Sequence, residues 1–509
     1  MPKLLINNFT GGKAGSQFVG PANSYYNAQG LTADLELGRL IPGWNLNNIS
    51  DSGSNTELDL IVSFAIDSLN QVAYGVSSGG KLHKITGLPS APALVADATW
   101  AQTIGAGTDN HDAHSIFVGS HAIIWYEKAA SLNMFLYSYN DNTDGDVGRC
   151  VLSSGVLDDD WFSTLTGGAV LNKSFIHPLF VWKNDGRCYI GDGATIRYIY
   201  DDAGTTKASS NATVIPPGWE ITSFFDAGNY LGICAWYKGS IEVPNQCAVF
   251  LWDGISAQAI DSKVIDDGKI TASVVKNNIP YIFTGNKFNG LKTFDGQDIL
   301  KFQDDSDTVY SAPANQNRVD TYSKGIVWMT AVGSTIQINT YGALPRLSDK
   351  WEMPCVSIAT TTLGAIKLSG FTGSQDYILI SYTDGSNVHQ LKYFATGQIH
   401  TSGATLQTLY YSFPQRIRIN YIRVNLLDDL TTNEDFDLNM KWYDIDITGE
   451  TELGDFKFST DGAKCSKTFR LTPHNSYCHS FRLLLDWNTN TVASLGSIVV
   501  DYDYVPDLR

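Results

Sequence analysis

The stretch Val249-Phe250-Leu251-Trp252-Asp253-Gly254 shows the pattern on which most of this chain is built. Its apolar residues include β-branched and aromatic side chains that favour a strand, and the Asp-Gly pair supplies the positive φ angles of a tight hairpin turn. Comparable turns lie next to apolar runs at Ser78-Gly79-Gly80, Asp144-Gly145, Asp192-Gly193, Asp295-Gly296, Tyr341-Gly342 and Asp384-Gly385. Amphipathic helix is expected only in residues 31–40, so the sequence predicts an all-β protein.

The seven turns recur at intervals of about 42 to 66 residues. A unit of about 40 to 50 residues made of short strands cannot bury its own faces, and a repeat of such units is typical of the blades of a β-propeller. We therefore expect a propeller over residues 51–403, with seven blades as the first choice and six or eight as alternatives. A pair of stacked β-sandwiches with the same turn chemistry is the other interpretation of this repeat.

The pattern changes after Gly403, where the periodic Asp-Gly turns stop and the expected strands become longer. In residues 416–427 apolar and polar side chains alternate, with one slip after Asn420-Tyr421. Alternation predicts a sheet with one solvated face, and the slip predicts a β-bulge. We assign residues 404–509 to a separate β-sandwich or jelly roll, and residues 1–50 to an extended N-terminal arm.

The composition indicates a folded protein with an acidic surface. Of the 509 residues 43% are hydrophobic, which is enough apolar material for large cores and argues against a disordered chain. The 52 Asp and Glu residues outnumber the 35 Lys and Arg residues and give a formal net charge of -17. Because binding to DNA or to an anionic membrane depends on Lys and Arg, this charge argues against both roles.

The sequence has no run of 18 apolar residues and no apolar leader after Met1. We therefore expect neither a membrane span nor a secretory signal, and a protein that stays in an aqueous, cytoplasmic compartment. Its seven cysteines form no Cys-x-x-Cys motif and are expected to be reduced thiols. If any two of them pair, Cys465 and Cys478 are the candidates.

One loop has the residue types of a cation site. Asn140, Asn142 and Asp144 alternate before Gly145, as the first ligands of a calcium-binding loop do. Val151 stands where an EF-hand requires a bidentate Glu, so the EF-hand interpretation fails. A calcium site of another kind and a long polar hairpin loop are the two interpretations that are left.

Enzyme motifs are weak. The segment Gly75-Val76-Ser77-Ser78-Gly79 matches the pattern of a nucleophile elbow, but its expected context is a hairpin and not a strand-to-helix turn. The His and Asp residues of segment 109–114 fit no zinc spacing, and the acidic runs 158–160 and 304–307 are expected to be solvated turns. We therefore expect no catalytic and no cofactor-binding residues.

Tryptophans divide into two groups. Those within expected strands should pack in the core, and they are Trp125, Trp182, Trp236, Trp252 and Trp328. Those in loop-like contexts are the candidates for stacking on a sugar, and they are Trp161, Trp219 and Trp351.

Both ends of the chain carry distinctive stretches. At the N-terminus these are Leu5-Ile6-Asn7-Asn8-Phe9-Thr10-Gly11-Gly12, the polar segment 20–31, and Gly38-Arg39-Leu40 and Pro42-Gly43-Trp44. At the C-terminus the stretch is Ile498-Val499-Val500-Asp501-Tyr502-Asp503-Tyr504. The N-terminal stretches resemble the opening of structural proteins of tailed bacteriophages that carry a β-propeller, and the C-terminal stretch is similar to the closing strand of the sandwich that follows the propeller in such proteins.

The resemblance implies a non-enzymatic virion protein of the tail, such as a nozzle, a hub or a tail-attached module, that is assembled in the host cytoplasm. Its partners would be other virion proteins and further copies of itself around the tail axis, and possible roles are DNA passage and contact with a host-surface glycan. It implies no sequence-specific binding of nucleic acid and no membrane insertion. An acidic surface is compatible with DNA passage, because phosphate is repelled.

A second hypothesis is a carbohydrate-binding adhesin or a glycosidase on a propeller scaffold. Two carboxylates that converge at the propeller mouth, one of them with a raised pKa, would distinguish the glycosidase. A third hypothesis, a cellular propeller scaffold, gives no reason for the resemblance at the two ends.

Overall fold

The computed structural model shows a chain that is nearly all β. It describes residues 2–7, 9, 12–13, 17–18, 24–32, 40–42, 44–51, 60–95, 102–103, 121–141, 143–238, 246–265, 268–286, 290–294, 298–301, 318–322, 325–332, 335–341, 355–362, 367–373, 377–384, 386, 388–399, 403–444, 447–471, 476–488, 491 and 493–505. Within these ranges no helix is long and apolar enough to cross a membrane.

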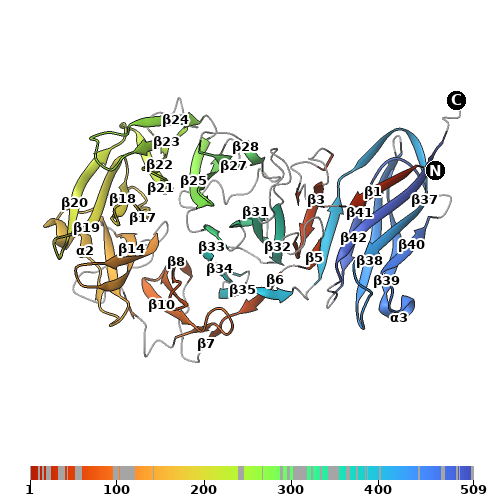
Figure 1. The fold of residues 1–509 in the computed structure, drawn as a ribbon, viewed down its shortest axis with the longest axis horizontal. Coiled ribbons are helices and arrows are strands. Elements are labelled where there is room, and N and C mark those ends of the chain that lie inside the picture. The colour runs from red at the N-terminus through yellow and green to blue at the C-terminus, as the bar shows by residue number, and fades with distance from the viewer. Residues whose placement is uncertain are drawn as a thin grey trace.

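The first blades of a β-propeller follow one another along the chain (Figure 1). Blade 1 contains β8 (Ile61–Asp67), β9 (Val72–Ser77) and β10 (Lys81–Thr86). β11 (Ala93–Leu94) and β12 (Gln102–Thr103) pair with β10, and β7 (Ser50–Asp51) pairs with β11. Blade 2 contains β13 (Ala122–Glu127), β14 (Leu132–Asn140), β15 (Gly145–Val151) and β16 (Leu157–Asp158). Blade 3 contains β17 (Leu179–Val181), β18 (Cys188–Asp192), β19 (Thr195–Asp202) and β20 (Thr205–Val214).

Four further blades complete the ring. Blade 4 contains β21 (Trp219–Ala227), β22 (Tyr230–Tyr237), β23 (Cys247–Trp252) and β24 (Asp261–Ile265). Blade 5 contains β25 (Gly268–Lys276), β26 (Ile279–Asn286), β27 (Gly290–Thr293) and β28 (Asp298–Lys301). Blade 6 contains β29 (Val319–Thr321), β30 (Ile326–Val332), β31 (Thr335–Tyr341) and β32 (Cys355–Thr362). Blade 7 contains β33 (Lys367–Gly373), β34 (Tyr377–Thr383), β35 (His389–Ile399) and the N-terminal strand β6 (Trp44–Asn48).

The first strand of each blade faces the centre of the ring. These inner strands contact one another in cyclic order, from β8 through β13, β17, β21, β25 and β29 to β33, and β33 contacts β8 again. The propeller therefore has seven blades, as the spacing of the turns predicts, and the stacked-sandwich alternative is wrong.

An N-terminal strand closes the ring. β6 pairs antiparallel with β35, with Leu46 opposite Phe394 and Asn48 opposite Lys392. Blade 7 therefore combines residues from both ends of the propeller sequence, and the closing strand lies before residue 51, within the segment that the sequence suggests is an arm.

Buried serines join neighbouring blades. The four contacts are Ala122 N–H to Ser63 Oγ at 3.0 Å, Ile61 N–H to Ser381 Oγ at 3.1 Å, Ser138 Oγ–H to the His177 carbonyl at 2.7 Å and Ser273 Oγ–H to the Phe224 carbonyl at 3.1 Å. Each contact satisfies a buried backbone group that a strand ladder leaves unpaired where two blades meet.

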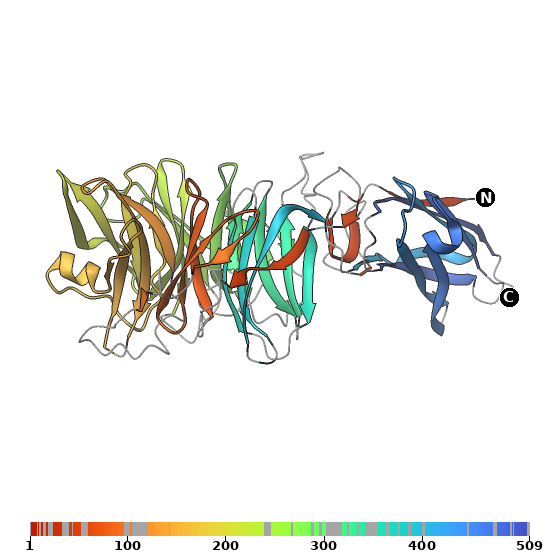
Figure 2. The ribbon, with the colours of Figure 1, turned by 90° about the horizontal axis from the view of Figure 1, so that it is seen from below.

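A curled sheet follows the propeller and lies beside it (Figure 2). Its strands are β36 (Ala404–Thr408), β37 (Tyr411–Leu426), β38 (Asp435–Asp444), β39 (Ile447–Lys457), β40 (Ser466–Arg470), β41 (Tyr477–Trp487) and β42 (Leu495–Tyr504). The start of β37 pairs with β41, whereas Val424 near its end lies opposite Lys467 of β40 on one side and Ile498 of β42 on the other. The sheet therefore branches along β37, and its buried side chains, such as Ile422 and Leu483, share one core.

The slip predicted after Asn420-Tyr421 is confirmed. The pairing of β37 with β42 shifts register between Ile419 and Tyr421, as a β-bulge requires. The alternating run 416–427 lies almost wholly within β37, whereas no such pattern marks β39. β39 is difficult to predict because it contains two glycines and three acidic residues, which are poor strand formers.

Residues 1–51 pair with other parts of the same chain. β1 (Lys3–Asn7) lies along β42, and β3 (Ser24–Gln29) lies between β36 and β32 of blade 6. The shorter strands are β2 (Gly12–Lys13), which pairs with β3, and β4 (Leu31–Thr32), which pairs with β5 (Ile41–Pro42). The core of the C-terminal sheet therefore continues into blades 6 and 7, through side chains such as Tyr25, Val327 and Ile378.

Helix forms where the sequence does not suggest it. α2 (Trp161–Thr166) follows β16, and α3 (Phe458–Asp461) follows β39. Of the expected helical window 31–40, residues 31–32 are strand, Leu40 makes a β-bridge to Leu495, and residues 33–39 lie outside the described residues. The helical expectation is therefore wrong at both ends of that window.

Candidate functional site

A cavity of about 660 Å³ opens among the inner strands of blades 2 to 6. We call it the axial cavity, because the strands that line it surround the centre of the ring. Its walls come from the residue before β13, from β17, from the ends of β21 and β25, and from β29. A volume of roughly 300 to 1,000 Å³ is usual for sites that hold small molecules.

His121 is a hydrogen-bond donor in the wall of the axial cavity. Its Nδ1 accepts the backbone N–H of Leu179 at 2.9 Å, so this nitrogen carries no proton. Burial lowers the pKa of the imidazole to about 4, which leaves the ring neutral at pH 7 with its proton on Nε2. Among the described residues Nε2–H has no partner, and the ring lines the cavity.

Charged and amide side chains gather where the inner strands end. Asp226 Oδ1 accepts the N–H of Gly228 at 2.9 Å and caps the turn after β21, while its second oxygen has no partner in the described part of the chain. Asn277 and Asn278 form the turn between β25 and β26 with φ of 54° and 61°, as a tight hairpin requires. Lys183 lies exposed at the same cavity and makes no ion pair with a described residue.

The wall also contains apolar side chains. Phe180 and Val274 are half-buried and line the cavity, and Phe180 packs on the buried Phe224 with ring centroids 6.5 Å apart. The axial cavity thus combines one accessible aromatic ring with a few polar groups that are not engaged by the described part of the protein. None of these polar residues was predicted, although Asp226-Ala227-Gly228 and Asn277-Asn278 carry the turn signal that could have found their positions.

The residues proposed for calcium occupy the turn between β14 and β15. Asn140 Oδ1 lies 2.8 Å from His177 Nε2, and its amide nitrogen donates to the Phe175 carbonyl at 2.9 Å. The Asp144 N–H donates to Asp141 Oδ1, and Asn142 lies outside the described residues. In the described ranges no three His, Cys, Asp or Glu side chains are grouped to hold a metal ion. The calcium site stays a prediction, and Asn140 already uses its oxygen within the protein.

Of the weak enzyme motifs, the one at residues 75–79 lies in a hairpin that the structure describes. Gly75 and Ser77 lie in β9 of the antiparallel β9–β10 hairpin, and Ser77 Oγ accepts the N–H of Lys81 at 3.0 Å. The expected hairpin context is therefore confirmed. The segments 109–114 and 304–307 lie outside the described residues.

The structure corrects part of the tryptophan assignment. Trp161 was expected to be exposed but is buried at the start of α2, 5.9 Å from the ring of Trp125, with the Arg149 guanidinium over its face. Trp219 is half-buried against Tyr237 and Phe250, and Trp351 lies outside the described residues. Of the expected core group only Trp236 is half-buried, and the others are buried, namely Trp125, Trp182, Trp252 and Trp328.

The six cysteines whose side chains are described are free thiols. Cys465 is exposed and Cys478 is buried, so these two candidates for a disulfide are not joined.

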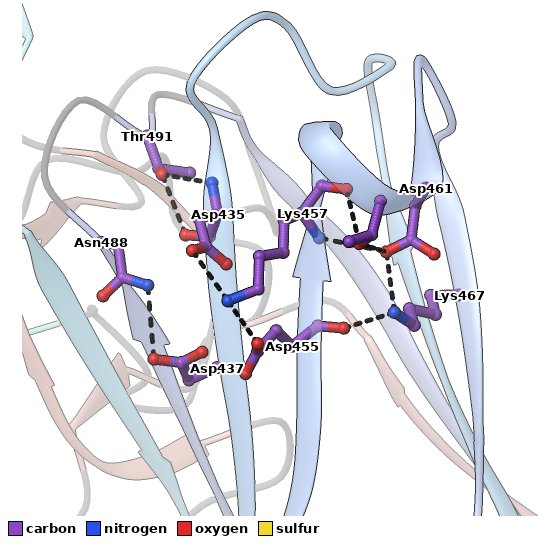
Figure 3. Close-up of polar contacts among 9 residues, drawn as sticks. Asp435, Asp437, Asp455, Lys457, Asp461, Lys467, Asn488 and Thr491 are labelled. Carbon is purple, nitrogen blue, oxygen red and sulfur yellow. Dashed lines mark hydrogen bonds and ion pairs between the residues drawn. The ribbon is translucent and has the colours of Figure 1, made fainter.

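A network of Asp and Lys side chains covers one end of the C-terminal sheet (Figure 3). Asp437 of β38 lies opposite Asp455 of β39, and Lys457 contacts Asp455 closely and Asp435 at 3.6 Å. Burial and a hydrogen bond with Asp455 raise the pKa of Asp437, while the Lys457 ammonium lowers the pKa of Asp455. Lys467 bonds Asp461 at 2.7 Å and also the Asp455 carbonyl.

This network does not have the geometry of a glycosidase. Asp437 and Asp455 share a hydrogen bond, whereas the two carboxyl groups of a glycosidase are about 5 Å or more apart. The carboxyl groups whose pKa is clearly raised do not line the axial cavity, and they are Asp146, Asp158, Asp437 and Asp486. The feature that would distinguish a glycosidase is therefore not seen at the described part of the cavity.

Comparisons with known proteins give no relative from which a function could be carried over. No family model matches the chain, and no curated protein matches its sequence.

Proposed function

We propose that this chain is a non-enzymatic structural protein of a tailed-phage virion, mounted on the tail. The observation that carries the proposal is the pairing of β1 with β42, which places Ile6 opposite Ile498 and Leu4 opposite Val500. β42 contains the C-terminal stretch 498–504 that resembles propeller-bearing phage proteins, and β1 contains the first three residues, Leu5 to Asn7, of the N-terminal stretch. Two sequence matches that are almost 500 residues apart thus belong to one paired structural unit.

The mechanical design of the chain also supports this role. The N-terminal segment contributes to the C-terminal sheet, to the junction with blade 6 and to the closure of blade 7. A closed ring that shares its core with a second sheet can transmit load without the two parts separating. We propose that the sheet of residues 404–509, completed by β1, is a β-sandwich or jelly roll that contacts neighbouring virion proteins, with the ring repeated around the tail axis.

The acidic charge supports a place near the DNA conduit. A net charge of -17 repels phosphate, so DNA would pass such a surface without sticking to it. Nozzle and hub positions would use this property, whereas a peripheral module would not need it.

Electron microscopy of phage particles with gold-labelled antibodies against this chain tests the proposal. We expect label on the tail, on its axis for a nozzle or hub and at its side for a tail-attached module. Antibodies that have been absorbed with the purified chain serve as the control. Unlabelled particles from a lysate in which the chain is abundant would refute a virion role.

A further inference from the structure

The axial cavity presents hydrogen-bonding groups that the protein itself does not use. His121 offers its Nε2–H and Lys183 its ammonium as donors, and Asp226 offers its second carboxylate oxygen as an acceptor. The amides of Asn277 and Asn278 can donate and accept, and in the described part of the chain they have no partner. Lys183, Asn277 and Asn278 are exposed, and His121 and Asp226 are half-buried, so water can bond to all of these groups. A ligand with hydroxyl groups would replace that water and keep their hydrogen bonds.

The charges around the cavity favour a neutral ligand. Lys183 is accompanied by the carboxylates of Asp226 and Asp320, and His121 is neutral at pH 7. Lys276, the residue before Asn277, interacts with Asp320, so the described charges near the cavity balance. These groups do not form the cationic cluster that a phosphorylated or polycarboxylated ligand requires.

The size of the axial cavity and the residues of its wall narrow the class of ligand further. The cavity of about 660 Å³ has the volume of a small-molecule site, and the half-buried Phe180 side chain provides apolar surface for the C–H face of a sugar ring. Hydroxyl groups both donate and accept, so they match a wall that mixes carboxylate, amide and N–H groups.

We infer that the axial cavity binds a neutral sugar ring, with Asp226, Asn277 and Asn278 hydrogen-bonded to its hydroxyl groups and Phe180 against its apolar face. The inference does not depend on a virion role, because the cavity is formed within one chain. It assigns recognition to the propeller and leaves the C-terminal sheet for assembly.

The test uses the full-length chain on a glycan microarray that presents terminal hexoses, N-acetylhexosamines, deoxyhexoses and sialic acid. Saturation-transfer NMR with the corresponding free monosaccharides then measures the affinity. Asp226→Asn keeps the turn cap through Oδ1 and replaces the free carboxylate oxygen. The double variant Asn277→Gly, Asn278→Gly keeps the positive φ of the turn and removes both amides.

Asn433→Gly is the matched control, because Asn433 also has a positive φ of 74° but lies outside the axial cavity. We expect binding to a neutral sugar that weakens at least about tenfold in Asp226→Asn and in the double variant, and that is unchanged in the control. Thermal unfolding is measured for every variant to check that each is folded. An array without a bound neutral sugar, a preference for sialic acid, or binding that both cavity variants retain would overturn the inference.

Discussion

The propeller and the C-terminal sheet are assembled from opposite kinds of contact. Most blades pair strands that follow one another in the sequence, such as β21 to β24, so their contacts are local. The C-terminal sheet pairs β1 with β42 and β3 with β36, which brings the two ends of the chain together. The N-terminal segment therefore stabilises both regions, since it also closes blade 7 through β6.

Removing residues 1–51 should destabilise the protein more than any point substitution. The deletion exposes the edges of β42 and β35 and opens the shared core around Tyr25. We expect the truncated chain to lose cooperative thermal unfolding, as followed by circular dichroism. Deletion of residues 1–7 alone is the control, and it should destabilise the C-terminal sheet while hydrogen exchange in blades 2 to 5 stays slow. An unchanged melting temperature after the longer deletion would contradict this view of the molecule.

The same contrast explains how much of the fold could be predicted from the sequence. The seven turns yield the correct number of blades, although they do not mark equivalent places. Gly79, Gly145 and Gly193 lie between the second and third strands of their blades, whereas Gly254 lies between the third and fourth. The interval from Gly193 to Gly254 is long because the turn lies at a different position in blade 4. The number of turns still equals the number of blades, because each blade has one such turn.

The long-range contacts could not be predicted in this way. Nothing local in residues 44–48 indicates that they complete a blade formed some 350 residues later, because any strand edge of suitable register could accept them. The axial cavity was missed for a related reason, since its polar residues come from five blades and meet only when the ring closes. Trp161 was misplaced because the six-residue helix α2, at whose start it is buried, is too short to show a detectable periodicity.

A buried carboxyl group should make the stability of the propeller depend on pH. Burial raises the pKa of Asp146 in β15 from 3.8 to about 7, although its Oδ1 accepts the N–H groups of Val147 and Ser163. The folded state thus binds a proton that the unfolded state releases between about pH 4 and pH 7. The stability contributed by this group is complete below pH 4 and is lost as the pH rises through 7.

Asp146→Asn keeps the oxygen that accepts both N–H groups and removes the ionisation. Relative to the parent chain, the variant should gain stability between pH 5 and pH 8, by at most about 4 kcal/mol for a shift of this size. Chemical denaturation at several pH values measures the difference. A difference in unfolding free energy that does not change with pH would show that Asp146 is not the group responsible.

The propeller and the C-terminal sheet each contain a glycine that lies under an aromatic ring. The loss of unfolding free energy on Gly→Ala can therefore be compared between the two regions. A Cβ on Gly148 in blade 2 would meet the ring of Tyr137 at 2.3 Å, and a Cβ on Gly449 would meet the ring of Trp442 at 2.4 Å. Tyr137 is fully buried, whereas Trp442 is half-buried and can move outward. Gly148→Ala should therefore cost about 1–3 kcal/mol of unfolding free energy, as overpacked cores do, and Gly449→Ala clearly less.

Gly232→Ala in blade 4 is the second measurement of this set, because the Phe225 ring lies 2.3 Å from its Cβ position in a buried hairpin. Its cost should match that of Gly148→Ala in denaturant titrations. Equal costs at all three glycines would mean that packing around the C-terminal sheet is as rigid as packing within the blades.

The smallest effect is expected in the Asp and Lys network of the C-terminal sheet. The raised pKa of Asp437 and the lowered pKa of Asp455 indicate that Asp437 takes the shared proton first. Asp437→Asn imitates that protonated form, because its amide can donate to Asp455, so we expect a gain below about 1 kcal/mol at pH 7. Lys457→Met removes the ammonium that neutralises Asp455 and should lower the stability slightly. Since both groups are partly exposed, salt should reduce each effect, and a salt-independent loss in the lysine variant would assign its role to packing of the lysine stem.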